Sequence, residues 1–227
     1  MDTTLGTTSM RQLALDLVDA PVASFENFVV GRNAEALTYL KDVLKTQTER
    51  FIYLWGEPGS GRTHLLQSVA AAHESASYVH CEPDSVFSDS ALLLLVDEVD
   101  RLGAQAQHSL FIQYNRLRET GGCLIASGPV PPVQLALRAD VLTRLAWGLV
   151  FQIHALNDEE KAKALEQQAW ARGWKLSSEA IAYLLTHVAR DMGALYGVVQ
   201  ALDRYSLETK RAVTIPLIRQ WLLNNPS

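Results

Sequence analysis

The sequence has little of what secreted, membrane-spanning or nucleic-acid-binding proteins usually carry. Its two cysteines, Cys81 and Cys123, are far apart and form no CxxC pair, so free thiols in a reducing compartment are expected. The apolar run at residues 91–96 is much shorter than the about 20 residues that cross a bilayer. The N-terminus lacks the basic start and long apolar core of a secretory signal. These absences favour a cytoplasmic protein with no membrane partner.

A surplus of positive charge is also missing. The net charge is −5, from 25 acidic and 20 basic residues, which lowers the expectation of a nucleic-acid partner. With 227 residues the chain can bury a sizeable core and hold one large domain plus a small one.

Residues 56–63 read Gly-Glu-Pro-Gly-Ser-Gly-Arg-Thr, the spacing of a phosphate-binding loop in which arginine replaces the usual lysine. An apolar strand pattern at 51–55 precedes the loop and a helical pattern at 64–70 follows it, whereas a plain glycine-rich turn is the alternative. Backbone N–H groups and the helix dipole would hold a phosphate there. The loop residues predicted to bind a cofactor are Gly56, Pro58, Gly59, Ser60, Gly61, Arg62, Thr63 and His64.

Two of these residues have more specific expected roles. Thr63 would hold Mg²⁺ through its hydroxyl group, and Arg62 would reach the β- or γ-phosphate. Arginine keeps the positive charge but replaces a compact ammonium with a wide planar fork, so binding should survive better than hydrolysis. The change favours ADP or ATP as a structural or regulatory ligand rather than as fuel.

The pattern of short apolar strands and helical stretches at residues 25–153 predicts an α/β domain with a parallel β-sheet flanked by helices. From Leu156 onward the pattern is helical, and Asn157 with Glu160 forms a capping-box arrangement. Trp170, Trp174 and Trp221 are expected in the core of this second domain. The expected strands are 51–55, 77–81, 91–96, 122–126 and 149–153, and the expected helices are 161–172, 178–189, 191–208 and 216–224.

An acidic pair, Asp97 and Glu98, follows the apolar strand at 91–96. A carboxylate at that strand end lies beside the phosphate loop, so Asp97 is predicted to hold the Mg²⁺ shell. Glu98 would orient an attacking water molecule as a base, although it could equally be a surface charge.

Several segments resemble the AAA+ module of the bacterial replication initiator DnaA, and within that clade the Hda family of short homologues that inactivate the initiator. Residues 25–33 read Phe-Glu-Asn-Phe-Val-Val-Gly-Arg-Asn, and Thr-His-Leu-Leu ends the phosphate loop. Residues 143–149 match the segment that supplies the arginine finger. Arg190-Asp191-Met192 matches the sensor arginine of the lid, and residues 213–216 match the start of the final lid helix.

The resemblance implies an AAA+ P-loop domain at 23–154 and a small all-α lid domain at 155–227, with a flexible tail at 1–22. By the same analogy Val29 and Val30 line the adenine pocket, and Arg190 closes over the nucleotide. Arg144 is the arginine finger and acts in trans, on a nucleotide held by a neighbouring molecule. A surface salt bridge is the alternative role for Arg144.

The sequence departs from the DnaA pattern in three places. No helix-turn-helix domain follows the lid, and only nine residues, 82–90, lie where the initiator has an additional helix. Gly128 stands where the initiator has a sensor aspartate. We therefore expect no direct sequence-specific DNA binding, and weak or absent ATPase activity of the chain itself.

The tail contains a glutamine followed by leucines at alternate positions, Gln12, Leu13, Leu15 and Leu17. Alternate residues share one side of an extended segment. The pattern resembles the peptide with which bacterial proteins dock on the DNA polymerase III sliding clamp (its β subunit). Without that resemblance it would read as a disordered tail or an edge strand.

Together these resemblances imply a negative regulator of chromosomal replication initiation. It would dock on the DNA-loaded clamp and stimulate ATP hydrolysis by DnaA through Arg144, giving inactive ADP-DnaA. The alternative is a helicase-loader-like AAA+ remodeller with its own turnover, which the Asp97-Glu98 pair favours and which Arg62 and Gly128 disfavour. A small-molecule P-loop kinase is disfavoured by the lid and the finger segment. A finger on one side and a nucleotide cleft on the other also permit a homodimer.

Overall fold

A computed structural model describes residues 22–43, 49–188 and 191–224 of the chain. The four residues predicted to bind the clamp, Gln12, Leu13, Leu15 and Leu17, lie outside the described residues, and so does Arg190. No helix in the described ranges is long and apolar enough to cross a membrane.

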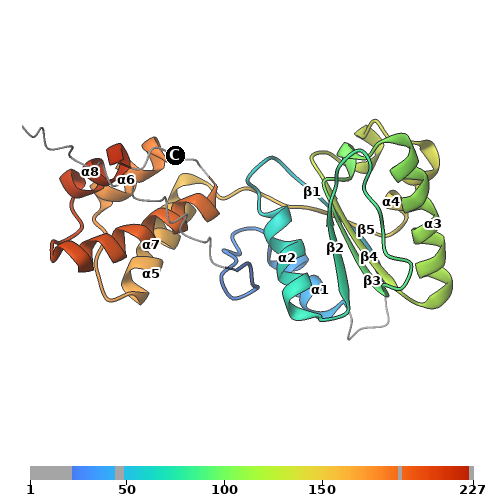
Figure 1. Ribbon diagram of the computed structural model, residues 1–227, viewed down its shortest axis with the longest axis horizontal. Coiled ribbons are helices and arrows are strands. Elements are labelled where there is room, and N and C mark those ends of the chain that lie inside the picture. Colours follow the sequence, from blue (N-terminus) through green and yellow to red (C-terminus); the bar gives the residue numbers. More distant parts are fainter. Residues whose placement is uncertain (1–21, 44–48, 189–190, 225–227) are drawn as a thin grey trace, which may run out of the picture.

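The larger part of the structure is a parallel five-stranded sheet with the order β2-β3-β4-β1-β5 (Figure 1). The predicted α/β class is confirmed, and each strand lies within two residues of its expected bounds. Both central strands β3 and β4 are buried along their whole length, as is usual for parallel strands covered on both faces. The strands are β1 Phe51–Trp55, β2 Ala76–His80, β3 Leu93–Asp97, β4 Cys123–Gly128 and β5 Leu149–Gln152.

Helices cover both faces of the sheet (Figure 1). Helices α1 (Ala34–Asp42) and α2 (Arg62–Ala72) lie on one face, and α3 (Ala104–Thr120) and α4 (Ala139–Trp147) lie on the other. Successive side chains of a strand point to opposite faces. Tyr53 accordingly packs in the core beneath α3 and α4, whereas its neighbours Ile52 and Leu54 pack beneath α1 and α2. Two short 3-10 helices, Val99–Arg101 and Pro132–Gln134, follow β3 and β4.

Four helices form the C-terminal part around a separate apolar core (Figure 1). The predicted capping box is present, because the Asn157 side chain accepts from the Glu160 N–H at 2.9 Å and Glu160 accepts from the Asn157 N–H at 2.8 Å. The placement of Trp170 in this core was wrong, since its side chain is 75% exposed while Ala169 beside it is buried. The helices are α5 Asp158–Ala171, α6 Ser178–His187, α7 Met192–Thr209 and α8 Ile215–Asn224.

Contacts from the segment before α1 fix the connection between the sheet and the four helices. The buried Asn33 amide donates to the His154 carbonyl at 2.9 Å and accepts from the His154 N–H at 2.8 Å. Gly31 has a φ of +48°, and a Cβ there would approach the Leu156 side chain to 2.7 Å. The segment that precedes α1 is thereby held against the chain that leads from β5 to α5.

Candidate nucleotide-binding site

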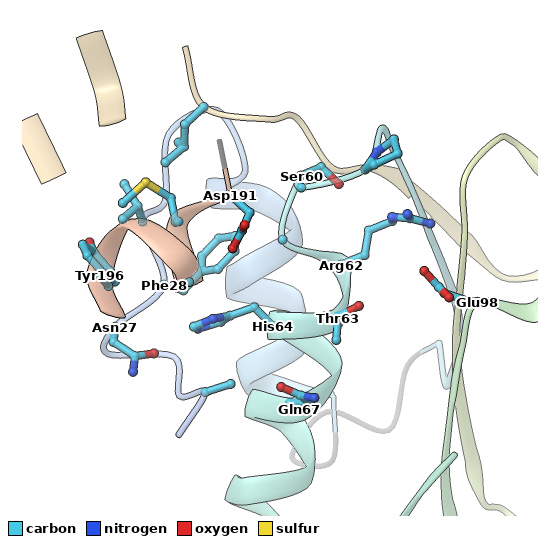
Figure 2. Close-up of a pocket in the computed structure, with 18 of the residues that line it drawn as sticks. Asn27, Phe28, Ser60, Arg62, Thr63, His64, Gln67, Glu98, Asp191 and Tyr196 are labelled. Carbon is cyan, nitrogen blue, oxygen red and sulfur yellow. The ribbon is translucent and has the colours of Figure 1, made fainter. Parts of the chain in front are cut away.

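A cavity of about 690 Å³ lies between the phosphate loop, the segment before α1 and the first turn of α7 (Figure 2). Most of the residues predicted to bind a cofactor line it, together with Glu98. The predicted residues in its wall are Val29, Pro58, Gly59, Ser60, Gly61, Arg62, Thr63, His64 and Glu98.

Backbone geometry explains the glycines of the loop. Gly59 and Gly61 have φ values of +76° and +100°, a region that side chains disfavour. A Cβ at Gly61 would also approach the Phe28 ring to 2.8 Å. Gly56 does not line the cavity; instead it lets the loop begin against the Ile153 carbonyl, which a Cβ at this position would overlap.

One end of the cavity is polar and has unused hydrogen-bonding capacity. Ser60 Oγ and one terminal nitrogen of Arg62 are buried and have no hydrogen-bond partner among the described residues. A buried polar group without a partner costs about 1–3 kcal/mol, so both atoms are suited to a ligand oxygen. Gly61 caps α2, whose free N–H groups face the same region. In Figure 2 the Arg62 side chain extends toward Glu98.

The other end of the cavity is aromatic. The rings of Phe28 and His64 lie 5.5 Å apart, and Tyr196 lies nearby on α7 (Figure 2). His64 Nε2 lies 3.0 Å from the Ser24 carbonyl, and this bond holds the ring in place. Burial lowers the pKa of His64, although the bond to Ser24 opposes the shift, so the ring is neutral at pH 7. A neutral aromatic wall suits the flat ring of a nucleotide base.

The structure separates other predicted residues from the cavity. Val30 is 37% exposed and is not part of the wall. Arg144 lies on α4, on the sheet face opposite α2, and does not line the cavity. Asp97 is fully buried at the end of β3 and is also absent from the wall.

Asp97 is surrounded by hydroxyl donors. Ser127 Oγ donates to its Oδ1, and the Tyr78 hydroxyl donates to its Oδ2 at 2.9 Å. Both carboxylate oxygens of Asp97 already accept hydrogen bonds from protein hydroxyls, and Asp97 is not part of the cavity wall, so Asp97 itself does not fit as a direct magnesium ligand there.

Sequence reasoning missed several residues of the wall, mainly at the aromatic end. Phe28 adjoins the predicted Val29, so the segment was identified but its ring was overlooked. Asp191, Met192 and Tyr196 follow the predicted Arg190, and the start of a lid helix was the available signal. The missed wall residues are Ala23, Asn27, Phe28, Gln67, Asp100, Arg101, Pro129, Leu156, Asp191, Met192, Gly193 and Tyr196.

A tyrosine explains the glycine in the loop after β4. A Cβ at Gly128 would overlap the hydroxyl oxygen of Tyr53. That hydroxyl donates to the Val130 carbonyl at 2.9 Å, which fixes the ring. The position where an initiator aspartate was expected therefore has no room for a side chain.

Comparison with known proteins identifies the family to which the chain belongs. Residues 158–222 match the family model of the Hda lid domain. An uncharacterized protein of Haemophilus influenzae is 31% identical over 93% of this chain and 98% of its own length. The chain belongs to the Hda family of DnaA-related AAA+ proteins.

Solved structures show the same fold for this Hda-family chain. Domain III of the Thermotoga maritima replication initiation protein DnaA is similar with a TM-score of 0.70 and 21% identity, over 90% of this chain and 97% of that one. AMPPCP-bound DnaA from Aquifex aeolicus is similar with a TM-score of 0.67 and 21% identity, over 83% of this chain and 67% of that one. The shared fold extends over both parts of this chain, and the four C-terminal helices, which contain the matched residues 158–222, correspond to the lid.

The contact between Gly128 and Tyr53 predicts a coupled pair of substitutions. Gly128→Ala should lower the free energy of unfolding by about 1–3 kcal/mol, because the new methyl group meets a buried hydroxyl. Tyr53→Phe should cost about 1 kcal/mol for the lost hydrogen bond, and Gly128→Ala should then cost less in that background. Urea unfolding of the four proteins measures the coupling. Equal costs of Gly128→Ala in both backgrounds would contradict the proposed overlap.

Proposed function

We propose that this chain is a negative regulator of chromosomal replication initiation, which docks on the DNA-loaded sliding clamp and stimulates ATP hydrolysis by DnaA. Arg144 would supply the catalytic charge to the nucleotide of DnaA, leaving the initiator in its inactive ADP form. The nucleotide in the chain's own cavity, ADP or ATP, would serve as a structural ligand.

The surroundings of Arg144 carry this proposal. Its guanidinium lies 4.7 Å from the centre of the Trp147 ring, 5.5 Å from Phe111 and 5.6 Å from Tyr114. Contacts of this kind attract the cation and restrict its rotamers. A side chain already held in one orientation loses little entropy when it meets a phosphate.

Apart from these aromatic contacts, the guanidinium of Arg144 is not engaged by other groups of the described residues. Its Nε is buried and has no hydrogen-bond partner there, so a ligand from outside would meet the terminal nitrogens of Arg144. No ion pair with a carboxylate is found for it in the described ranges, so an ordinary salt bridge is disfavoured there. The guanidinium lies across the sheet from the chain's own cavity, and its positive charge suits the transition state of phosphoryl transfer in a neighbouring subunit.

The chain's own site supports retention of a nucleotide rather than turnover. Glu98, the expected base, accepts from Arg101 at 2.8 Å, which favours a charge-paired role. Gly128 offers no side chain to polarise a γ-phosphate or a water molecule, and Tyr53 fills the space above it. Weak intrinsic hydrolysis is therefore proposed, with the chemistry assigned to the partner.

The decisive experiment measures ATP hydrolysis by DnaA in the presence of clamp loaded on DNA. Arg144→Ala should leave folding and clamp docking intact but reduce the stimulation by about a thousandfold or more, because a transition-state contact is lost. Arg144→Lys should restore little, since it keeps the charge but loses the planar fork.

Arg118→Ala is the matched control for this experiment. Arg118 also lies 4.7 Å from the centre of the Trp147 ring, so its removal takes away an equivalent cation–π contact. The Arg118→Ala variant should retain most of the stimulation of ATP hydrolysis by DnaA. Full stimulation by Arg144→Ala would show that the mechanism is wrong even though the family is right.

Binding of a nucleotide to the cavity can be tested without any partner. A ligand that binds only the folded protein raises its stability by about 2.7 kcal/mol at a hundred times its Kd. ADP should therefore raise the melting temperature of the wild type, and Arg62→Ala should remove the increase. Arg62→Lys, which restores the usual residue of such loops, should keep it. A melting temperature indifferent to millimolar ADP would contradict a nucleotide site.

Clamp docking is assigned to Gln12, Leu13, Leu15 and Leu17 and has its own test. Changing Gln12 and Leu13 to alanine should abolish capture by immobilised clamp while leaving the melting temperature unchanged, because the segment precedes the predicted domain. A variant with Thr7 and Thr8 changed to alanine is the control. Capture of both variants at the wild-type level would remove the docking role.

A further inference from the structure

The carboxylate of Asp97 has a local role that the expected magnesium function does not explain. Its Oδ1 accepts from Ser127, and its Oδ2 accepts from the Tyr78 hydroxyl at 2.9 Å. These hydroxyls come from the two strands beside β3, so one carboxylate links three neighbouring strands at the carboxyl edge of the sheet.

Tyr78 is a stable donor in this arrangement. An ordinary phenol hydroxyl carries its proton throughout the neutral pH range, so Tyr78 donates to Asp97 there. Hydrogen bonds to a charged acceptor are about twice as strong as neutral ones, so Tyr78 and Ser127 hold the carboxylate firmly in place.

Ser127 extends the linkage to the cavity wall. Its Oγ accepts from the Glu98 N–H at 3.0 Å while it donates to Asp97. Glu98 has a φ of +59°, an uncommon conformation for a residue with a side chain. The chain from Asp97 through Ser127 thus holds the backbone turn that brings Glu98 to the cavity.

The positive charge that Mg²⁺ would supply is already available beside the loop. Arg62 lines the cavity with a terminal nitrogen that lacks a hydrogen-bond partner within the described residues. Ser60 Oγ and the N-terminus of α2 provide further donors. Asp97, in contrast, is fully buried and is not part of the wall.

We propose that nucleotide binds in this cavity without a divalent cation, and that Asp97 is a positioning residue which orders the sheet edge through Tyr78 and Ser127. The inference rests on the proposed nucleotide site. It adds that Arg62 is the one loop side chain that neutralises the negative charge of the phosphates. Thr63 then contacts the phosphate rather than a metal ion.

Calorimetric titration of ADP into the purified full-length protein tests this directly, once with excess MgCl₂ and once with excess EDTA. The two Kd values should agree within about twofold. A Kd more than about tenfold weaker in EDTA would overturn the inference while leaving the nucleotide site in place. Absence of ADP binding in both buffers would refute the nucleotide site itself, and the inference with it.

Variants separate a positioning residue from a metal ligand. Asp97→Asn should lower the melting temperature and change ADP affinity by the same factor in both buffers. A loss confined to the magnesium buffer would identify Asp97 as a metal ligand and overturn the inference.

Tyr78→Phe covers the case in which Asp97→Asn does not fold. It should lower the melting temperature through the lost hydrogen bond, and its ADP affinity should stay independent of magnesium. Tyr114→Phe, which removes a hydroxyl in the core on the other face, is the control. A magnesium requirement in Tyr78→Phe and in the wild type alike would count against the proposal.

Discussion

The carboxylate of Asp97 and the two hydroxyl groups that donate to it connect three strands beside the candidate nucleotide site. Tyr78 from β2 and Ser127 from β4 converge on this single buried acceptor, and Ser127 continues to the backbone of Glu98. Because the carboxyl ends of parallel strands meet at one edge, this network joins β2, β3 and β4 there. The backbone of Glu98, which lines the cavity, is held by it through Ser127.

The alternation of side chains along β1 separates the two proposed sites of the protein. Ile52 and Leu54 support the face that carries α2 and the cavity, whereas Tyr53 supports the face that carries α4 and Arg144. The proposed nucleotide site and the proposed arginine finger therefore lie on opposite faces of the same small domain. Tyr53 contributes to both, since its hydroxyl also excludes a side chain at Gly128.

The spacing of residues in the sequence was sufficient to predict the phosphate loop and the sheet, because glycine positions and apolar strand patterns depend on residues close together in the chain. It was insufficient to predict the positions of side chains that are decided by contacts between residues far apart in the chain. Phe28 became part of the wall through its contact with Gly61, and Asp97 was diverted from the cavity by hydroxyls 19 and 30 residues away. Trp170 turned outward because Leu165 and Ala169 occupy the core face of α5, which composition alone does not reveal.

The paired hydrogen bonds between Asn33 and His154 limit where the lid can pivot. Any rotation about a point before His154 would break both bonds or drag the entry of α1, with its buried residues, out of the sheet. A pivot would therefore have to lie after His154, ahead of the capped start of α5, where Leu156 also packs against Gly31. Since Asp191 and Tyr196 of α7 and its cap line the cavity, and Asp191 lies beside Gly59 of the phosphate loop, rotation of these helices would change both ends of the cavity wall.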